Sequence, residues 1–77
     1  MATETQTVLW RMTRAERERA HAVMLPGGPP FTIAFFANDA MDRVENYDTV
    51  GLALFRVNEI RRSLETAGWV ADESSRR

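Results

Sequence analysis

The segment Pro26-Gly27-Gly28-Pro29-Pro30 divides the chain into two structural halves. Its glycines free the backbone, and each proline lacks an N–H donor and fixes φ, so neither a helix nor a central strand can run through it. The chain has 77 residues, and a protein of this size buries only about 60% of its unfolded surface. Neither half can therefore hold a core alone, and the two must share one small core.

We expect a single domain over residues 7–70, with a flexible arm (1–6) before it and a polar tail (71–77) after it. The chain has no cysteine, which removes disulfide frameworks and thiolate nucleophiles and makes a reducing cytoplasm the natural compartment. Its N-terminus is polar and acidic, unlike a signal peptide, and its longest apolar run, residues 33–37, is too short to cross a bilayer. These features predict a cytoplasmic protein without membrane contact.

The N-terminal half begins with the alternation that is typical of a strand, over residues 7–13. One face is predicted to carry Val8, Trp10 and Met12, and the other Leu9, Arg11 and Thr13.

Residues 13–25 allow two interpretations. Thr13 and Glu16 have the spacing of a capping box, and good helix formers follow, which indicates a helix ending at Pro26. That helix would have a poor apolar stripe. The alternative is a polar hairpin tip over residues 15–18 and a returning strand over residues 19–25, which we favour because buried periodicity overrides intrinsic propensity.

After the break, residues 31–37 form the clearest strand, with Phe31, Ile33 and Phe35 on one face. A turn at Asn38-Asp39 then leads into a second strand over residues 41–47, although Asn38 is also a suitable cap for an early helix. In the strand interpretation, one face carries Met41, Arg43, Glu45 and Tyr47, and the other carries Asp42, Val44 and Asn46.

A C-terminal helix follows, because seven apolar residues recur with its period. Its stripe consists of Val50, Ala53, Leu54, Val57, Ile60, Leu64 and Ala67.

The ends of this helix also have sequence signals. Asp48 is the expected N-cap, and in that register Tyr47 and Leu52 form a hydrophobic staple. Gly68 ends the helix at the position called C′, which predicts a Schellman motif in which Trp69 folds back toward Leu64. The whole pattern predicts an α+β domain of two layers, an antiparallel meander of three or four strands packed against one C-terminal α-helix.

The sequence contains no recognisable catalytic constellation. His21 is the only histidine, so a histidine-pair metal site cannot form within one chain, and no serine has the context of a nucleophile elbow. Asp39, Asp42, Glu45 and Asp48 recur at every third residue, which sends successive side chains of a strand to opposite faces. We therefore expect no enzyme activity, no cofactor and no metal. The rival hypothesis is a small hydrolase or metal-dependent enzyme built on the acidic stretch.

The chain has more large apolar residues than a two-layer domain of this size can cover. Phe55 and Leu52 lie on the side of the helix away from its stripe, and Phe36 and Leu9 lie on the uncovered side of the predicted sheet. Aromatic residues rimmed by charge are typical of protein interfaces. The predicted interface consists of Phe55, Leu52, Glu59, Arg62, Phe36 and Leu9.

These observations favour a small non-enzymatic protein-interaction module. A chain of this kind suits an inhibitor or adaptor that binds a larger protein or protein complex, such as those that bacteriophages encode, and it can also pair as a homodimer. Binding to nucleic acid is the alternative, although a formal net charge of −1 argues against a broad positive field. The residues that would carry the alternative lie on the predicted hairpin: Trp10, Arg11, Arg14, Arg17 and Arg19.

Overall fold

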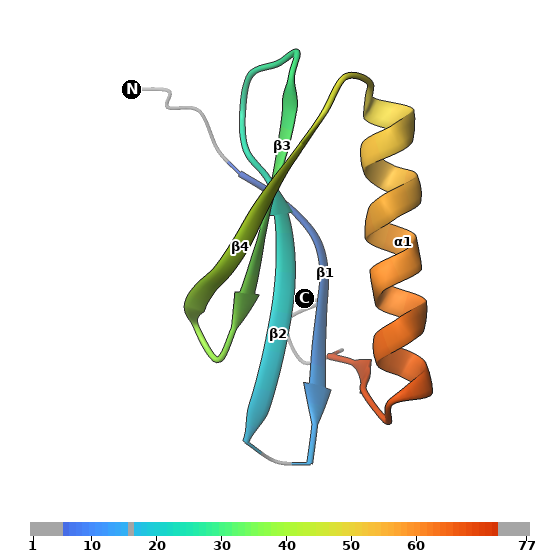
Figure 1. Ribbon diagram of the computed structural model, residues 1–77. Helices are drawn as coiled ribbons and strands as arrows, with labels where there is room; N and C mark the ends of the chain where they lie inside the picture. The colour runs from blue at the N-terminus through green and yellow to red at the C-terminus, as the bar shows by residue number, and fades with distance from the viewer. Residues whose placement is uncertain (1–5, 16, 73–77) are drawn as a thin grey trace.

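The computed structural model describes residues 6–15 and 17–72, and these form one antiparallel sheet and one helix (Figure 1). The elements are β1 (Thr7–Arg14), β2 (Glu18–Met24), β3 (Phe31–Ala37), β4 (Ala40–Tyr47), α1 (Val50–Thr66) and β5 (Val70–Ala71). The strand order in the sheet is β4-β3-β2-β1-β5, so the first four strands form a meander. This arrangement confirms the predicted α+β architecture.

β1 and β2 form a hairpin, so residues 18–24 are a returning strand rather than part of a helix. β1 and β2 pair from Thr7 opposite Met24 down to Arg14 opposite Glu18. Ala15 turns the chain with a positive φ of 56°. The hairpin interpretation was therefore the right one, because strand pairing with the neighbours outweighs the helix propensity of this segment.

A β-bulge in β1 changes which side chains face the helix. The register shifts between Val8, which pairs with Val23, and Trp10, which pairs with Ala22. The extra residue is Leu9, which is half-buried and packs against the core beneath the helix. The predictions for two residues were therefore wrong: Val8 lies on the face away from the helix, and Leu9 does not lie on that uncovered face.

A second irregularity, between β3 and β4, has the same effect. Phe35 pairs with Arg43, but Phe36 pairs with Met41, so Asp42 is the extra residue. Met41 consequently lies beside Phe36 on the face away from the helix, contrary to the prediction that placed it with Arg43.

The core lies between α1 and the sheet. It is built from five buried residues, Ala22, Ile33, Phe35, Ala53 and Val57. Half-buried side chains surround them, and one, Trp10, donates its indole N–H to the carbonyl oxygen of Val57 at 3.3 Å.

The first turn of α1 begins one residue later than predicted. Thr49 has an extended backbone and is the N-cap, and its hydroxyl accepts a hydrogen bond from the N–H of Leu52 at 3.1 Å. Asp48 therefore precedes the cap, and Leu52 is the third helical residue rather than the fourth. The staple predicted between Tyr47 and Leu52 does not have its required spacing.

The C-terminal end of α1 is the predicted Schellman motif. The N–H of Trp69 donates to the carbonyl of Leu64 at 3.0 Å, and the N–H of Gly68 donates to that of Glu65 at 3.1 Å. Gly68 has a φ of +101°, which suits glycine. The turn directs the chain back to the sheet, where β5 pairs with β1 through Met12 and Thr13.

The sheet thus extends to Ala71, one residue beyond the expected domain, and Asp72 adds a backbone hydrogen bond to Arg11. The sequence gives no signal for this short strand. Residues 1–5 of the predicted arm and residues 73–77 of the predicted tail lie outside the described residues.

Candidate interaction site

The outer side of α1 carries two large apolar side chains in water. Phe55 is 64% exposed and Leu52 is 56% exposed, and they are three residues apart, so they are neighbours on one side of the helix. Glu59 and Arg62 continue the same side toward the C-terminus. We call these four residues, Leu52, Phe55, Glu59 and Arg62, the helix patch.

The position of the helix patch follows from where the helix meets the sheet. Ala53 and Val57 are buried against the sheet, and Phe55 points nearly the opposite way at about 100° per residue. Helical geometry therefore prevents Phe55 from reaching the core.

The charges at the edge of the patch differ in their partners. Glu59 lies 3.5 Å from Arg56, one turn away. Arg62 forms no ion pair with any described residue. The patch therefore combines an apolar centre with one guanidinium group that is available to a partner.

The first half of α1 has further exposed apolar side chains. Val50 and Leu54 are about 40% exposed on a different side from Phe55. A helix segment that is apolar on several sides is usually covered on several sides. The predicted stripe is thus only partly a core: Ala53 and Val57 are buried, while Val50 and Leu54 are not.

The face of the sheet away from α1, called here the far face, is a second apolar surface. Its central row runs across four strands: Val8, Val23, Ala34 and Val44. The inner two residues of this row are buried, and the outer two are exposed. The middle of the far face is therefore buried, and its exposed apolar surface lies toward its edges.

The next row of the far face contains the predicted interface residue Phe36. Its ring stacks on that of His21, with centroids 4.5 Å apart and planes 4° apart, and both residues are half-buried. Burial lowers the pKa of His21, and the positive charge of Arg11 lowers it further. Met41 lies beyond Phe36 in the same row and is 57% exposed.

Of the six predicted interface residues, the structure brings four together and separates two. Leu52, Phe55, Glu59 and Arg62 share the outer side of α1, whereas Phe36 lies on the far face and Leu9 packs in the core. The sequence analysis missed Met41, Val44 and Val8. The register shifts move Val8 and Met41 to the face opposite the one that alternation predicts. Val44 lies on the face that alternation predicts but was not included in the predicted interface.

A polar cluster fixes α1 to β4. Glu45 accepts hydrogen bonds from the Tyr47 hydroxyl and from Arg56 Nε, and Arg43 Nε lies 3.2 Å from its second oxygen. The hydrogen bond from Tyr47 lowers the pKa of Glu45, and Arg56 lowers it further, although burial acts in the opposite direction. These groups satisfy one another, so we assign the cluster to the anchoring of α1.

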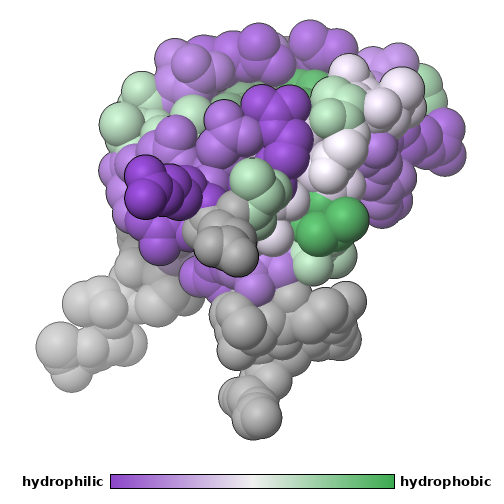
Figure 2. Space-filling model, turned by 90° about the horizontal axis from the view of Figure 1, so that it is seen from below, coloured by the Kyte–Doolittle hydropathy of each residue, from purple (hydrophilic) through white to green (hydrophobic). Residues whose placement is uncertain are grey.

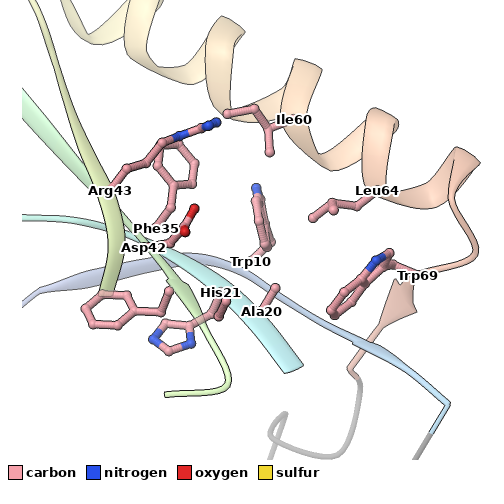
Figure 3. Close-up of a pocket in the computed structure, with 11 residues that line it drawn as sticks. Trp10, Ala20, His21, Phe35, Asp42, Arg43, Ile60, Leu64 and Trp69 are labelled. Carbon is pink, nitrogen blue, oxygen red and sulfur yellow. The ribbon is translucent and has the colours of Figure 1, made fainter. Parts of the chain in front are cut away.

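A cavity of about 250 Å³ lies between the second half of α1 and the sheet. Its aromatic lining includes Trp10, Phe35 and Trp69, and Ile60 and Leu64 face it from α1 (Figure 3). This is the end of the molecule at which the β1–β2 hairpin closes and the helix stops, where polar groups cover most of the surface (Figure 2).

The residues of the nucleic-acid alternative do not share one surface. Trp10 packs in the core, and Arg14 lies on the same side of the sheet, with its guanidinium 5.1 Å above the Trp69 ring. Arg11 and Arg19 belong to the far face, and Arg19 pairs with Asp39 at 2.6 Å. Arg17 is exposed at the hairpin tip.

The acidic residues considered for a metal site are also dispersed. Asp39 pairs with Arg19, and Glu45 belongs to the polar cluster. Among residues 6–15 and 17–72, no three histidine, aspartate or glutamate side chains are close enough to hold a metal ion. In the same part of the chain, no helix is both long enough and apolar enough to span a bilayer.

Comparison with known protein families, with curated proteins and with solved structures finds no match to this chain.

Proposed function

We propose that this protein is a non-enzymatic interaction module, an inhibitor or adaptor, that binds a larger protein through the helix patch. The observation that supports this proposal is the 64% exposure of Phe55 beside the 56% exposure of Leu52 on one side of a capped helix. Binding energy in protein interfaces is concentrated in a few large side chains that fill pockets of the partner. Phe55 is the side chain of this patch best suited to that role.

The partner that fits this patch presents an apolar groove with an acidic group near one end. A helix that lies in a groove uses anchors three and four residues apart, which is the relation of Leu52, Phe55 and Glu59. An acidic group in the partner would pair with Arg62, which lacks an ion pair among the described residues. We place this interaction in the cytoplasm, because the chain has no cysteine to support an oxidising compartment.

The helix patch is a better candidate than the far face. The middle of the far face is already buried, and Phe36 has a stacking partner in His21. Phe55 has no ring partner in the described chain.

The test is a photo-crosslinking experiment with a paired substitution. A crosslinking amino acid at position 55 should capture a defined protein from host lysate, whereas the same amino acid at Met41, which is 57% exposed on the far face of the sheet, should not. With the captured protein purified, Phe55→Asp should weaken binding at least about 30-fold, the effect of a 2 kcal/mol hot spot. Met41→Asp introduces the same charge at an exposed apolar position outside the helix patch and should leave the affinity within about twofold.

Stability measurements separate the loss of an interface from the loss of the fold. Phe55→Asp should change the free energy of unfolding by less than about 0.5 kcal/mol, as expected for an exposed position. A larger loss would mean that Phe55 belongs to the core, and undiminished binding by Phe55→Asp would eliminate the helix patch. Sedimentation of the purified protein over a range of concentrations identifies the case in which the partner is a second copy of this chain.

A further inference from the structure

The cavity beneath the second half of α1 has a floor of small side chains. Ala20 pairs with Ala37 across β2 and β3, and both line the cavity, as does Trp10 from β1. Two alanines opposite one another cannot fill the space below the last turns of α1. The cavity is therefore a consequence of residue size at two positions of the sheet.

Aromatic rings around this cavity already hold cations of the chain itself. The guanidinium carbon of Arg43 lies 5.1 Å from the centroid of Phe35, and that of Arg14 lies 5.1 Å from the centroid of Trp69. Both distances are within the range of about 6 Å over which the face of an aromatic ring attracts a cation. Among the described residues, no guanidinium group lies over the ring of Trp10.

One charge at the cavity remains unbalanced. Asp42, the extra residue of β4, lines the cavity, and Figure 3 shows its carboxylate directed between Phe35 and Trp10. This carboxylate forms no hydrogen bond or ion pair with a described residue. The neighbouring Arg43 pairs with Glu45 at 3.2 Å, so it does not neutralise Asp42.

The other charged side chains around Asp42 neutralise one another. Arg56 shares Glu45 with Arg43 and also contacts Glu59, so these two arginines and two glutamates have no net charge. Arg14 pairs with Glu18 at 2.6 Å. The net charge at the mouth of the cavity is therefore that of Asp42.

We propose that this cavity binds a compact organic cation, specifically an alkylated ammonium group. Aromatic walls combined with a carboxylate are the features that attract such groups, because the charge is spread over methyl groups that also favour an apolar surface. A cavity of about 150 Å³ accepts benzene, so about 250 Å³ is sufficient for a trimethylammonium headgroup. This site is separate from the helix patch, and neither proposal depends on the other.

Two ligands of equal shape provide the test. Choline carries a trimethylammonium group, and its neutral carbon isostere carries a tert-butyl group in the same place. Both tryptophans of the chain line the cavity, so tryptophan fluorescence and the two indole N–H resonances in NMR spectra report on its occupation. We expect choline to bind with a Kd on the order of 1 mM and the isostere to bind at least about fivefold more weakly. Equal binding of the two, or no response to either, would overturn the proposal.

A paired substitution tests the role of the carboxylate. Asp42→Asn should weaken choline binding by about threefold to fivefold, the effect of losing one exposed charge interaction. Asp48→Asn removes another exposed carboxylate, one that does not line the cavity, and it should leave the affinity unchanged. Equal affinities of the two variants would contradict the assignment of Asp42.

A third comparison identifies the source of the cation. A short peptide containing trimethyllysine should bind more tightly than choline if the group belongs to a protein partner, and no more tightly if the natural ligand is a small molecule. Unmethylated lysine in the same peptide is expected to bind at least about fivefold more weakly than trimethyllysine, since an ammonium group is strongly hydrated. Equal binding of the two peptides would show that net charge alone is responsible and would overturn the proposal.

Discussion

The same substitution, glycine to alanine, should have opposite effects at the two ends of α1. Gly51 lies in the first turn with an ordinary helical backbone, and a Cβ there would meet only Thr49 Oγ1 at 3.9 Å. Alanine loses less backbone entropy on folding than glycine, so Gly51→Ala should stabilise the protein by about 0.5–1 kcal/mol. Gly68 has a φ of +101°, a conformation that costs a residue with a Cβ about 1–2 kcal/mol.

The cost at Gly68 should come from the backbone alone. The nearest atom to its added Cβ would be Arg14 Cδ at 3.8 Å, which is an ordinary van der Waals distance. The two variants should therefore differ by about 1.5–3 kcal/mol, with the wild type between them. Each kcal/mol corresponds to about 4–8 °C in Tm for a domain of this size.

Urea denaturation, monitored by far-ultraviolet circular dichroism, tests this expectation. It gives the free energy of unfolding to roughly 10%. The Tm from a thermal scan is a second measurement. If Gly68→Ala is as stable as the wild type, then the Schellman turn does not depend on a positive φ at this residue. If Gly51→Ala is destabilised, then the first turn of α1 is not helical as described.

Two further predictions concern the N-cap and the single histidine. Thr49→Ala should destabilise the protein by about 1 kcal/mol because the N–H of Leu52 loses its acceptor, whereas Asp48→Ala should cost less than half as much; the reverse order of the two unfolding free energies would restore Asp48 as the cap. Burial lowers the pKa of His21 below its usual value of 6.5, so the unfolded chain takes up a proton more readily than the folded one. The contribution of His21 to the free energy of unfolding is at its full value above pH 6.5. It should decrease as the pH falls from 6.5 toward the folded-state pKa. Urea midpoints at about pH 7.5 and about pH 5.5 measure this decrease, and His21→Gln should reduce it; an equal decrease in that variant would assign it to other groups.

Most of the fold could be predicted from the sequence, because apolar periodicity reflects burial directly. The alternation of residues 31–37 and the stripe around Val57 each indicate the face that packs in the core. The Schellman turn could be predicted in detail because glycine at C′ and the apolar pair Leu64 and Trp69 are encoded within six residues.

The errors have a common physical origin in pairing between strands. Whether Leu9 or Asp42 is the extra residue of a bulge depends on the register against β2 or β3, and local sequence does not contain that register. Each bulge reverses the faces of the residues on one side of it, which is why Val8 and Met41 were misplaced. The N-cap was misassigned by one residue because Asp48 and Thr49 are both good caps.

Whether each candidate site could be predicted depended on whether it required the register between strands. The helix patch needs only the period of one helix, and the structure places its four residues on one side of α1 as predicted. The cavity needs Ala20 to lie opposite Ala37 and Asp42 to be displaced by a bulge. Both features arise only when three strands are aligned.

The order of the strands also has a consequence for how this chain folds during its synthesis. Each of the first four strands pairs with its neighbour in sequence, so the meander can form hairpin by hairpin with short loops to close, a topology that favours rapid folding. The helix that covers Ile33 and Phe35 is made last, and β5 follows it. A nascent chain that ends before residue 50 would therefore expose one apolar face of a nearly complete sheet, and termination at that point should yield an aggregation-prone product.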